Sequence, residues 1–158
     1  MAVKTVIVQK FKIADIVKDL NTTQDRIIEA CINTMRYVGE QCLTQARNYG
    51  NYQDITGNLR SSIGYAVLRA GKIVYQSSSK SYHGPKGDGS KGVSEGDALL
   101  KRLAGDYPSG IVLIVTAGME YAVYVEEIHG KDVLTSSSLL AEKLVPELLA
   151  QIGLKKKL

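Results

Sequence analysis

The feature that most constrains the fold is a stripe of apolar side chains within residues 24–50. The members of the stripe recur at steps of three and four positions: Ile28, Cys31, Met35, Val38, Cys42 and Ala46. This spacing places them all on one face of an α-helix of about seven turns. Residues 21–23 are good N-cap types, and Gly50 suits the left-handed position that follows a last helical turn. The stripe therefore predicts a long N-terminal helix that packs one face against a core.

Strand patterns occur in three places outside this helix. Residues 3–11 are rich in β-branched side chains and predict a strand. Residues 63–75 contain two apolar segments around Gly71, which predicts two strands joined by a tight turn. Residues 111–116 form a continuous apolar run, which is typical of a central strand that is buried on both faces.

Three further segments have the spacing of helices. Residues 13–20 predict a short helix, and residues 119–127 predict another that packs on the sheet. A last helix begins near residues 136–138, and Pro146 is expected to kink it. Its apolar stripe consists of Leu140, Leu144, Leu148 and Ile152. Together the patterns predict an α+β fold, in which a small mixed or antiparallel sheet is packed by a long N-terminal helix and a C-terminal helix.

The length of 158 residues predicts a single domain over residues 1–158. Residues 76–110 stand apart, because glycine and serine crowd this segment. Such a composition is poor in the apolar side chains that build a core, so the segment is predicted to be a flexible surface loop. One or two helical turns are expected only at residues 98–103.

Few side chains in this chain are suited to catalysis or metal binding. Cys31 and Cys42 are eleven positions apart, which is about 16 Å along a helix and too far for a disulfide. His83 and His129 have no ligand-like neighbours at metal spacing. The glycine-rich residues 84–92 lack the Gly-Lys-Ser/Thr ending of a phosphate-binding loop. The sequence therefore predicts no enzyme activity, no metal and no cofactor.

The charge balance is mildly basic, with 20 Lys and Arg against 16 Asp and Glu. Three of the basic residues sit together at 155–157. A small nucleic-acid-binding module is the alternative function of another class, and its phosphate contacts would come from residues 155–157 with Lys86, Lys91 and Arg102. No apolar stretch approaches the length of a membrane span, so no membrane partner is expected.

The aromatic composition is unusual, with nine tyrosines, one phenylalanine and no tryptophan. Tyrosine is common at protein interfaces, because it combines a large apolar ring with a hydroxyl group. Tyr121 and Tyr124 lie three positions apart and would share one face of a helix. They are expected either to contact a partner or to cap the core with their hydroxyl groups in water.

A short polar motif follows the long helix. Thr56 is placed to cap a turn that Gly57 permits. Leu59 and Ile63 lie four positions apart, so one helical turn would place both against the core. Arg60 is suited to bond carbonyl groups or a neighbouring carboxylate. The motif is therefore expected to shape the fold instead of performing chemistry.

This motif resembles the Asp-Thr-Gly-x-Leu-Arg-x-Ser-Ile signature of the HK-ninety-seven gp-ten-like family of phage tail components. The matching residues are Asp54, Thr56, Gly57, Leu59, Arg60, Ser62 and Ile63. A second segment is similar to the family's Tyr-Ala-x-Tyr-Val-Glu stretch, and its matching residues are Tyr121, Ala122, Tyr124, Val125 and Glu126. The chain departs from the family pattern at the additional Ile55, at residues 127–130 and in the long segment 76–110.

The resemblance implies a structural virion assembly protein of a tailed phage or prophage, which completes the tail or joins head to tail within an oligomeric ring. The implied partners are copies of the chain itself, commonly in a six-fold ring, together with head connector or tail tube proteins and non-specific DNA in the channel. Contacts in such rings are heterologous, because one patch meets a different patch of the next subunit. A tail terminator or another minor tail protein is the alternative within this class. The expected location is the virion, with the host cytoplasm during assembly.

Overall fold

The structure is a computed structural model that describes residues 6–11 and 24–154, with side chains in the second range only. The helix α2 (Gln24–Tyr49) confirms the prediction from the apolar stripe, since every member of the stripe is buried. The prediction of a left-handed conformation at Gly50 is wrong, because the φ of Gly50 is not positive. Instead, the Tyr52 ring packs where a side chain at position 50 would lie.

Four strands form one antiparallel sheet in the order β1-β4-β2-β3. The strands are β1 (Val6–Phe11), β2 (Ile63–Arg69), β3 (Lys72–Gln76) and β4 (Ile111–Ala117). β4 lies between β1 and β2 and is buried at every position, as its apolar run predicts. The turn between β2 and β3 holds Ala70 and Gly71 at φ values of 50° and 79°, and two successive positive values are typical of a two-residue hairpin turn.

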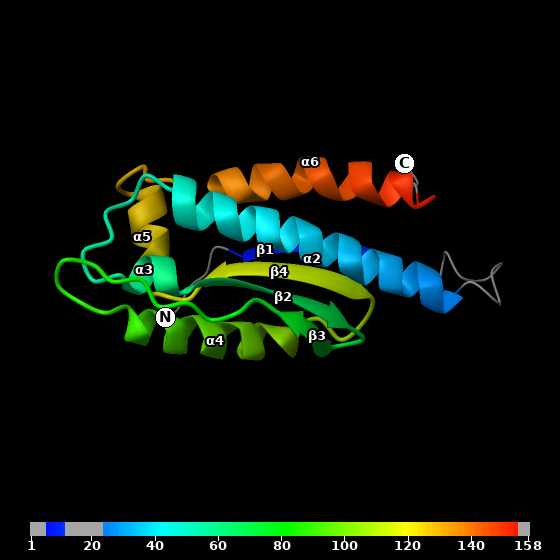
Figure 1. Ribbon diagram of the computed structural model, residues 1–158, viewed down its shortest axis with the longest axis horizontal. Helices are drawn as coiled ribbons and strands as arrows, with labels where there is room; N and C mark the ends of the chain where they lie inside the picture. The colour runs from blue at the N-terminus through cyan, green and yellow to red at the C-terminus, as the bar shows by residue number, and fades with distance from the viewer. Residues whose placement is uncertain (1–5, 12–23, 155–158) are drawn as a thin grey trace.

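Helices cover both faces of the sheet (Figure 1). α2 and α6 (Thr135–Gln151) lie together on one face, and α4 (Ser90–Ala104) lies on the other. Alternate side chains of β4 serve the two layers, since Leu113 faces the α2 core whereas Ile114 faces α4. The predicted α+β fold is therefore confirmed, and the sheet is antiparallel.

The helix α4 contradicts the prediction of a flexible loop over residues 76–110. The prediction is wrong for residues 90–97, which belong to a helix of 15 residues, whereas the helical turns expected at residues 98–103 are confirmed. Leu100 of this helix is buried beneath the sheet. Gly92 and Gly96 are buried too, because α4 packs its backbone directly against the backbone that precedes β2. The glycine content misled the prediction, since these glycines permit close helix packing.

Two short helices lie at one end of the molecule (Figure 1). α3 (Asn58–Ser61) is a single turn that leads into β2, and α5 (Ala122–Glu127) confirms a short helix in its segment. Pro146 lies inside α6 and does not end it. Three predicted features fall outside the described residues: the helix at 13–20, the N-caps at 21–23 and the basic cluster at 155–157.

Candidate functional site

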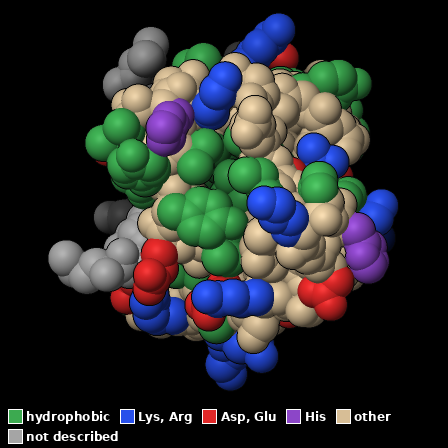
Figure 2. Space-filling model, turned by 90° about the vertical axis from the view of Figure 1, so that its left-hand side faces the viewer, with side chains coloured by type: hydrophobic (Ala, Val, Ile, Leu, Met, Phe, Trp, Pro, Cys, Tyr) green, Lys and Arg blue, Asp and Glu red, His purple; other side chains and the backbone are tan. Residues whose placement is uncertain are grey.

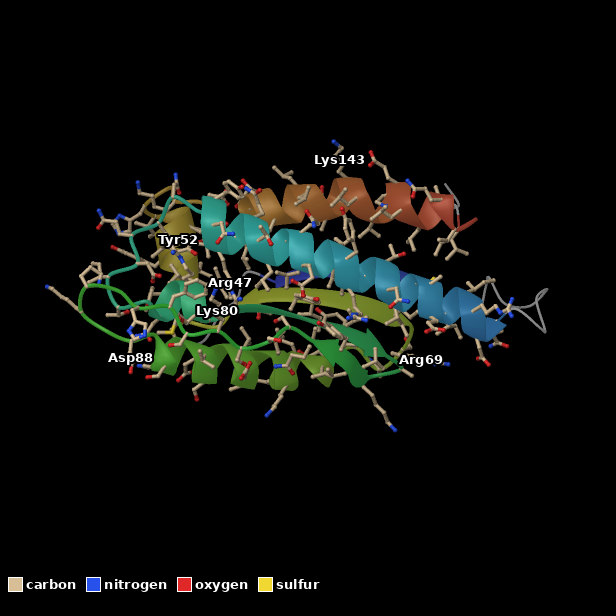
Figure 3. The ribbon with its side chains drawn as sticks, viewed as in Figure 1. Arg47, Tyr52, Arg69, Lys80, Asp88 and Lys143 are labelled. Carbon is tan, nitrogen blue, oxygen red and sulfur yellow. The ribbon has the colours of Figure 1, made fainter. Side chains whose placement is uncertain are left out.

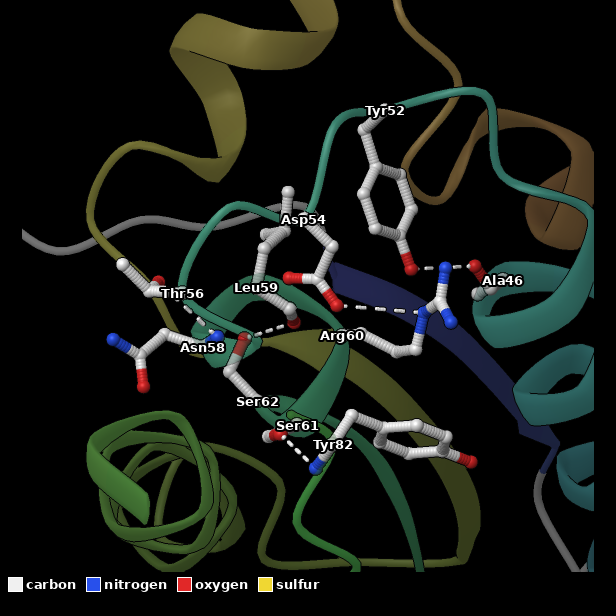
Figure 4. Close-up of polar contacts among 10 residues, drawn as sticks. All are labelled: Ala46, Tyr52, Asp54, Thr56, Asn58, Leu59, Arg60, Ser61, Ser62 and Tyr82. Carbon is white, nitrogen blue, oxygen red and sulfur yellow. Dashed lines mark hydrogen bonds and ion pairs between the residues drawn. The ribbon is translucent and has the colours of Figure 1, made fainter. Parts of the chain in front are cut away.

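The first motif begins with a tight turn that only glycine fits. Gly57 has a φ of 77°, and a Cβ atom at this position would collide with the carbonyl oxygen of Tyr82. The Thr56 hydroxyl oxygen accepts a hydrogen bond from the Asn58 amide at 3.4 Å, so Thr56 caps the turn as predicted (Figure 4). The turn opens α3, where the Ser61 amide donates to the Gly57 carbonyl oxygen at 3.0 Å.

The next residues of the motif face the interior. Leu59 and Ile63 are 2% and 1% exposed, which agrees with their predicted place in the core. The Ser62 hydroxyl donates to the Leu59 carbonyl oxygen at 2.8 Å and accepts from the Gly118 amide at 3.1 Å. Ser62 therefore joins α3 to the chain that leaves β4, and its hydroxyl is fully used within the fold.

Arg60 is held by a carboxylate of its own chain. Its Nε lies 3.5 Å from Oδ2 of Asp54, and the two side chains are 34% and 11% exposed (Figure 4). Burial raises the pKa of Asp54, whereas the charge of Arg60 lowers it. The Tyr52 ring lies beside this pair, and its hydroxyl donates to the Ala46 carbonyl oxygen at 2.9 Å. These contacts fasten the segment between α2 and α3 to the end of α2.

Arg47 is a structural residue that the sequence does not reveal, since its position next to the stripe predicts a solvated side chain. It is only 7% exposed, and its Nη2 donates to the Ile63 carbonyl oxygen at 2.6 Å. Burial lowers the pKa of Arg47. Its guanidinium carbon lies 5.5 Å from the centre of the Tyr82 ring, and the Lys80 ammonium nitrogen lies 4.9 Å from the same centre. Figure 3 labels Arg47 and Lys80, which lie near each other. Arg47 thus ties α2 to the start of β2.

The second motif forms α5 and anchors the helix that follows. Ala122 is fully buried, and Val125 packs against the core beneath α2. Oε1 of Glu126 accepts hydrogen bonds from the amides of Leu134 and Thr135 at 3.0 and 2.7 Å, and from the Thr135 hydroxyl at 2.6 Å. These amides open α6, so Glu126 caps the N-terminus of α6 from a different helix. No short-range pattern marks this role, because the capped residues lie eight and nine positions further on.

The two motifs meet at one end of the molecule. Burial raises the pKa of Tyr121, the neighbouring Thr56 side chain lowers it, and the charge of Asp54 raises it. Tyr121 of the second motif therefore lies beside the turn of the first motif. α3 and α5 accordingly lie at the same end of the ribbon (Figure 1).

Four large apolar side chains at this end are exposed, and we call them the end patch. They are Ile55 (51% exposed), Tyr121 (39%), Tyr124 (52%) and Ile128 (68%). Figure 2 faces this end and shows hydrophobic side chains gathered in its middle, with charged side chains around them. The Tyr124 ring also packs edge-on against His129, with 4.9 Å between the ring centres. Partial exposure of both tyrosines fits contact with a partner as well as a role as caps of the core.

The candidate metal ligands and the two thiols lie in the described part of the chain. Among residues 24–154 and 6–11, no group of three or more His, Cys, Asp and Glu side chains is placed to hold a metal ion. Cys31 and Cys42 are free and buried. Burial raises the pKa of Cys31 to about 11 and that of Cys42 to about 12, so neither thiol is activated as a nucleophile at neutral pH.

Two basic residues of the alternative nucleic-acid module lie at opposite ends of α4. Lys91 lies in the first turn of α4 and Arg102 in its last, about 16 Å apart along the axis. In the part of the chain that the structure describes, no helix is both long and apolar enough to span a lipid bilayer.

No protein-family model, curated protein or solved structure matches this chain.

Proposed function

We propose that this chain is a structural virion assembly protein of a tailed phage or prophage, which completes the tail or joins head to tail as one subunit of an oligomeric ring. The observation that carries the proposal is the end patch. Ile55 interrupts the first motif, Tyr121 and Tyr124 belong to the second, and Ile128 follows it. Both exposed tyrosines thus belong to a segment that resembles the tail-component family, whereas Ile55 and Ile128 stand where the chain departs from the family pattern.

The exposure of the end patch favours association in energetic terms. Monomeric soluble proteins seldom gather large apolar side chains on one face without a function. Full burial of one such side chain contributes about 1.5–3 kcal/mol. The four residues are 39–68% exposed, so covering them all contributes about 3–6 kcal/mol before the entropy cost of association. Such a contact is weak alone, and a closed ring repeats it at every subunit.

The polar residues of both motifs support a structural role over an enzymatic one. Asp54 pairs with Arg60, Ser62 bonds two backbone groups, and Glu126 caps α6. A catalytic acid, base or nucleophile has to reach a substrate, whereas Ser62 and Glu126 are hydrogen-bonded within the fold and Asp54 is paired through Oδ2 with Arg60. We therefore propose no enzyme activity and no cofactor. Within the class of tail proteins, a tail terminator is the alternative, and head connector or tail tube proteins are the proposed neighbours in the virion.

Sedimentation velocity over a range of concentrations tests the self-association. The wild type is expected to form a species larger than the 17.2-kDa chain as concentration rises. Ile128→Ser removes the most exposed member of the end patch and is expected to weaken this association by about tenfold or more. Leu139→Ser is the matched control, because Leu139 is 62% exposed on α6 and lies outside the patch. Equal association of the two variants would contradict the role of the end patch.

Mass spectrometry of purified tailed particles tests the place in the virion. The particles are induced from the strain that carries the gene, and the protein is expected at a fixed copy number per particle. Its absence from intact particles would contradict the proposal, whatever the protein does alone in solution.

A further inference from the structure

A groove of about 270 Å³ runs along α2 beside strands β2 and β3. The side chains that line it are Asn33, Arg36, Tyr37, Glu40, Tyr65 and Tyr75. The four residues from α2 recur at helical spacing, so they form one face of that helix. The rings of Tyr65 and Tyr75 stack with their centres 5.8 Å apart. The volume lies just below the range of about 300–1,000 Å³ that is typical of small-molecule pockets, so the groove suits protruding side chains of another protein better.

The charged groups of the groove are held in place and still have bonding capacity. The Tyr65 hydroxyl donates to Oε1 of Glu40 at 2.6 Å, which fixes that carboxylate. The guanidinium carbon of Arg36 lies 3.9 Å from the centre of the Tyr75 ring. Among the described residues, the Arg36 side chain makes no hydrogen bond and no ion pair, so its donors are available.

The composition of the groove is that of an interaction hot spot. Tyrosine and arginine are the residues most enriched where few side chains carry most of a binding energy. Tyr37 stands at the rim of the groove and is 52% exposed. Arg36 is already stacked on Tyr75, so it loses little freedom when a partner binds.

The charges of the groove complement those around the end patch. Glu127 and Lys131 lie close to Ile128 of the end patch in the sequence, and both are exposed. Within the described part of the chain, neither takes part in an ion pair. Arg36 and Glu40 give the groove the same pair of opposite charges. Each surface therefore offers one acidic and one basic group to the other.

The two surfaces also lie on different parts of the molecule. The end patch lies at the end that carries α5, whereas the groove is lined by residues 33–40 of α2 together with Tyr65 and Tyr75. In Figure 1, α5 lies at one end of the molecule and α2 runs along its long side. A patch that binds its own copy produces a two-fold dimer, so a larger ring needs two different surfaces. We propose that the end patch of one subunit docks into the α2–β3 groove of the next copy of this chain, an inference that rests on the proposed ring function.

Mixing two assembly-deficient variants tests this docking directly. Arg36→Glu alters the groove and leaves the end patch intact, whereas Ile128→Ser alters the end patch and leaves the groove intact. Each variant alone is expected to stay monomeric at a concentration where the wild type assembles. An equimolar mixture contains one compatible pair of surfaces, so it is expected to give a heterodimer of about twice the 17.2-kDa mass of the chain, which cannot grow further.

Two controls make the result specific. Arg26→Glu is the same substitution on an exposed residue of α2 outside the groove, and it is expected to assemble like the wild type. Tyr37→Ser is a second groove variant and is expected to behave like Arg36→Glu, with circular dichroism checking that each variant is folded. A wild type that never associates contradicts the ring itself. If the wild type assembles but the groove variants also assemble, or if the mixture stays monomeric, the proposed docking into the groove is wrong. The proposal of a ring is not contradicted by that result.

Discussion

Gly96 offers a sharp test of how α4 packs against the rest of the fold. A Cβ atom at this position would lie 2.5 Å from the Ser62 carbonyl oxygen, and a Cβ atom at Gly118 would lie 2.6 Å from the Gly96 Cα. A carbon and an oxygen normally stay at least about 3.3 Å apart. Gly96→Ala therefore forces α4 away from the backbone at Ser62 by about 0.8 Å.

The net effect of Gly96→Ala combines two opposing contributions. Alanine favours a helix interior over glycine by about 1 kcal/mol. Overpacking a tight contact costs about 1–3 kcal/mol, and here the obstacle is backbone, which yields less than a side chain. The expected result is a net loss of about 1–2 kcal/mol in the free energy of unfolding, which corresponds to roughly 2–8 °C in melting temperature for a chain of this size.

Gly105→Ala is the matched control, since it makes the same substitution at the end of the same helix. Gly105 has a φ of −67°, and a Cβ atom there would meet only the Arg102 carbonyl oxygen at 3.6 Å. The control is therefore expected to be neutral or to stabilise by about 0.4–1 kcal/mol. Urea unfolding followed by circular dichroism measures both variants, with the m-value checking that the unfolding reaction is unchanged. The reasoning is refuted if Gly96→Ala proves at least as stable as Gly105→Ala.

Three further predictions concern single side chains. Glu126→Ala removes the cap of α6 and is expected to lower the free energy of unfolding by about 1–2 kcal/mol in urea titrations, whereas an unchanged midpoint would deny the capping role. Cys31 and Cys42 are expected to stay unreactive toward an aromatic disulfide reagent at pH 8 until urea unfolds the chain, because burial raises their pKa values to about 11 and about 12. Burial raises the pKa of Tyr52 to about 12 from an ordinary value near 10. The folded state therefore keeps a proton that the unfolded state releases, so stability falls as pH rises from 10 to 12, and Tyr52→Phe is expected to make that fall shallower in urea titrations at each pH.

The sequence predicts the elements whose apolar pattern is continuous. The stripe from Ile28 to Ala46 has a single face, so it indicates α2 without help from other segments. The run at residues 111–116 has apolar side chains on both faces, which only a central strand between two helical layers can bury. Tertiary contacts reinforce these local patterns, so the α+β fold can be predicted from the local patterns.

The sequence does not predict what depends on contacts between distant backbones. Gly96 is typical of a loop in a local window, and its close contact with Ser62 exists only once α4 lies beneath the sheet. Arg47 resembles any solvated residue beside an apolar stripe, and its acceptor at Ile63 lies sixteen positions away. The first motif is a similar case. Gly57 and Thr56 shape a turn as predicted, but the sequence does not reveal the Tyr82 carbonyl oxygen that prevents any residue other than glycine at position 57.

Electron microscopy of the purified protein, concentrated into the range where sedimentation shows association, tests the central proposal most directly. The account predicts closed rings of uniform diameter, in which the α5 end of each subunit rests against the long side of its neighbour. Particles that remain monomers at every concentration would contradict it, as would two-fold dimers that join their α5 ends.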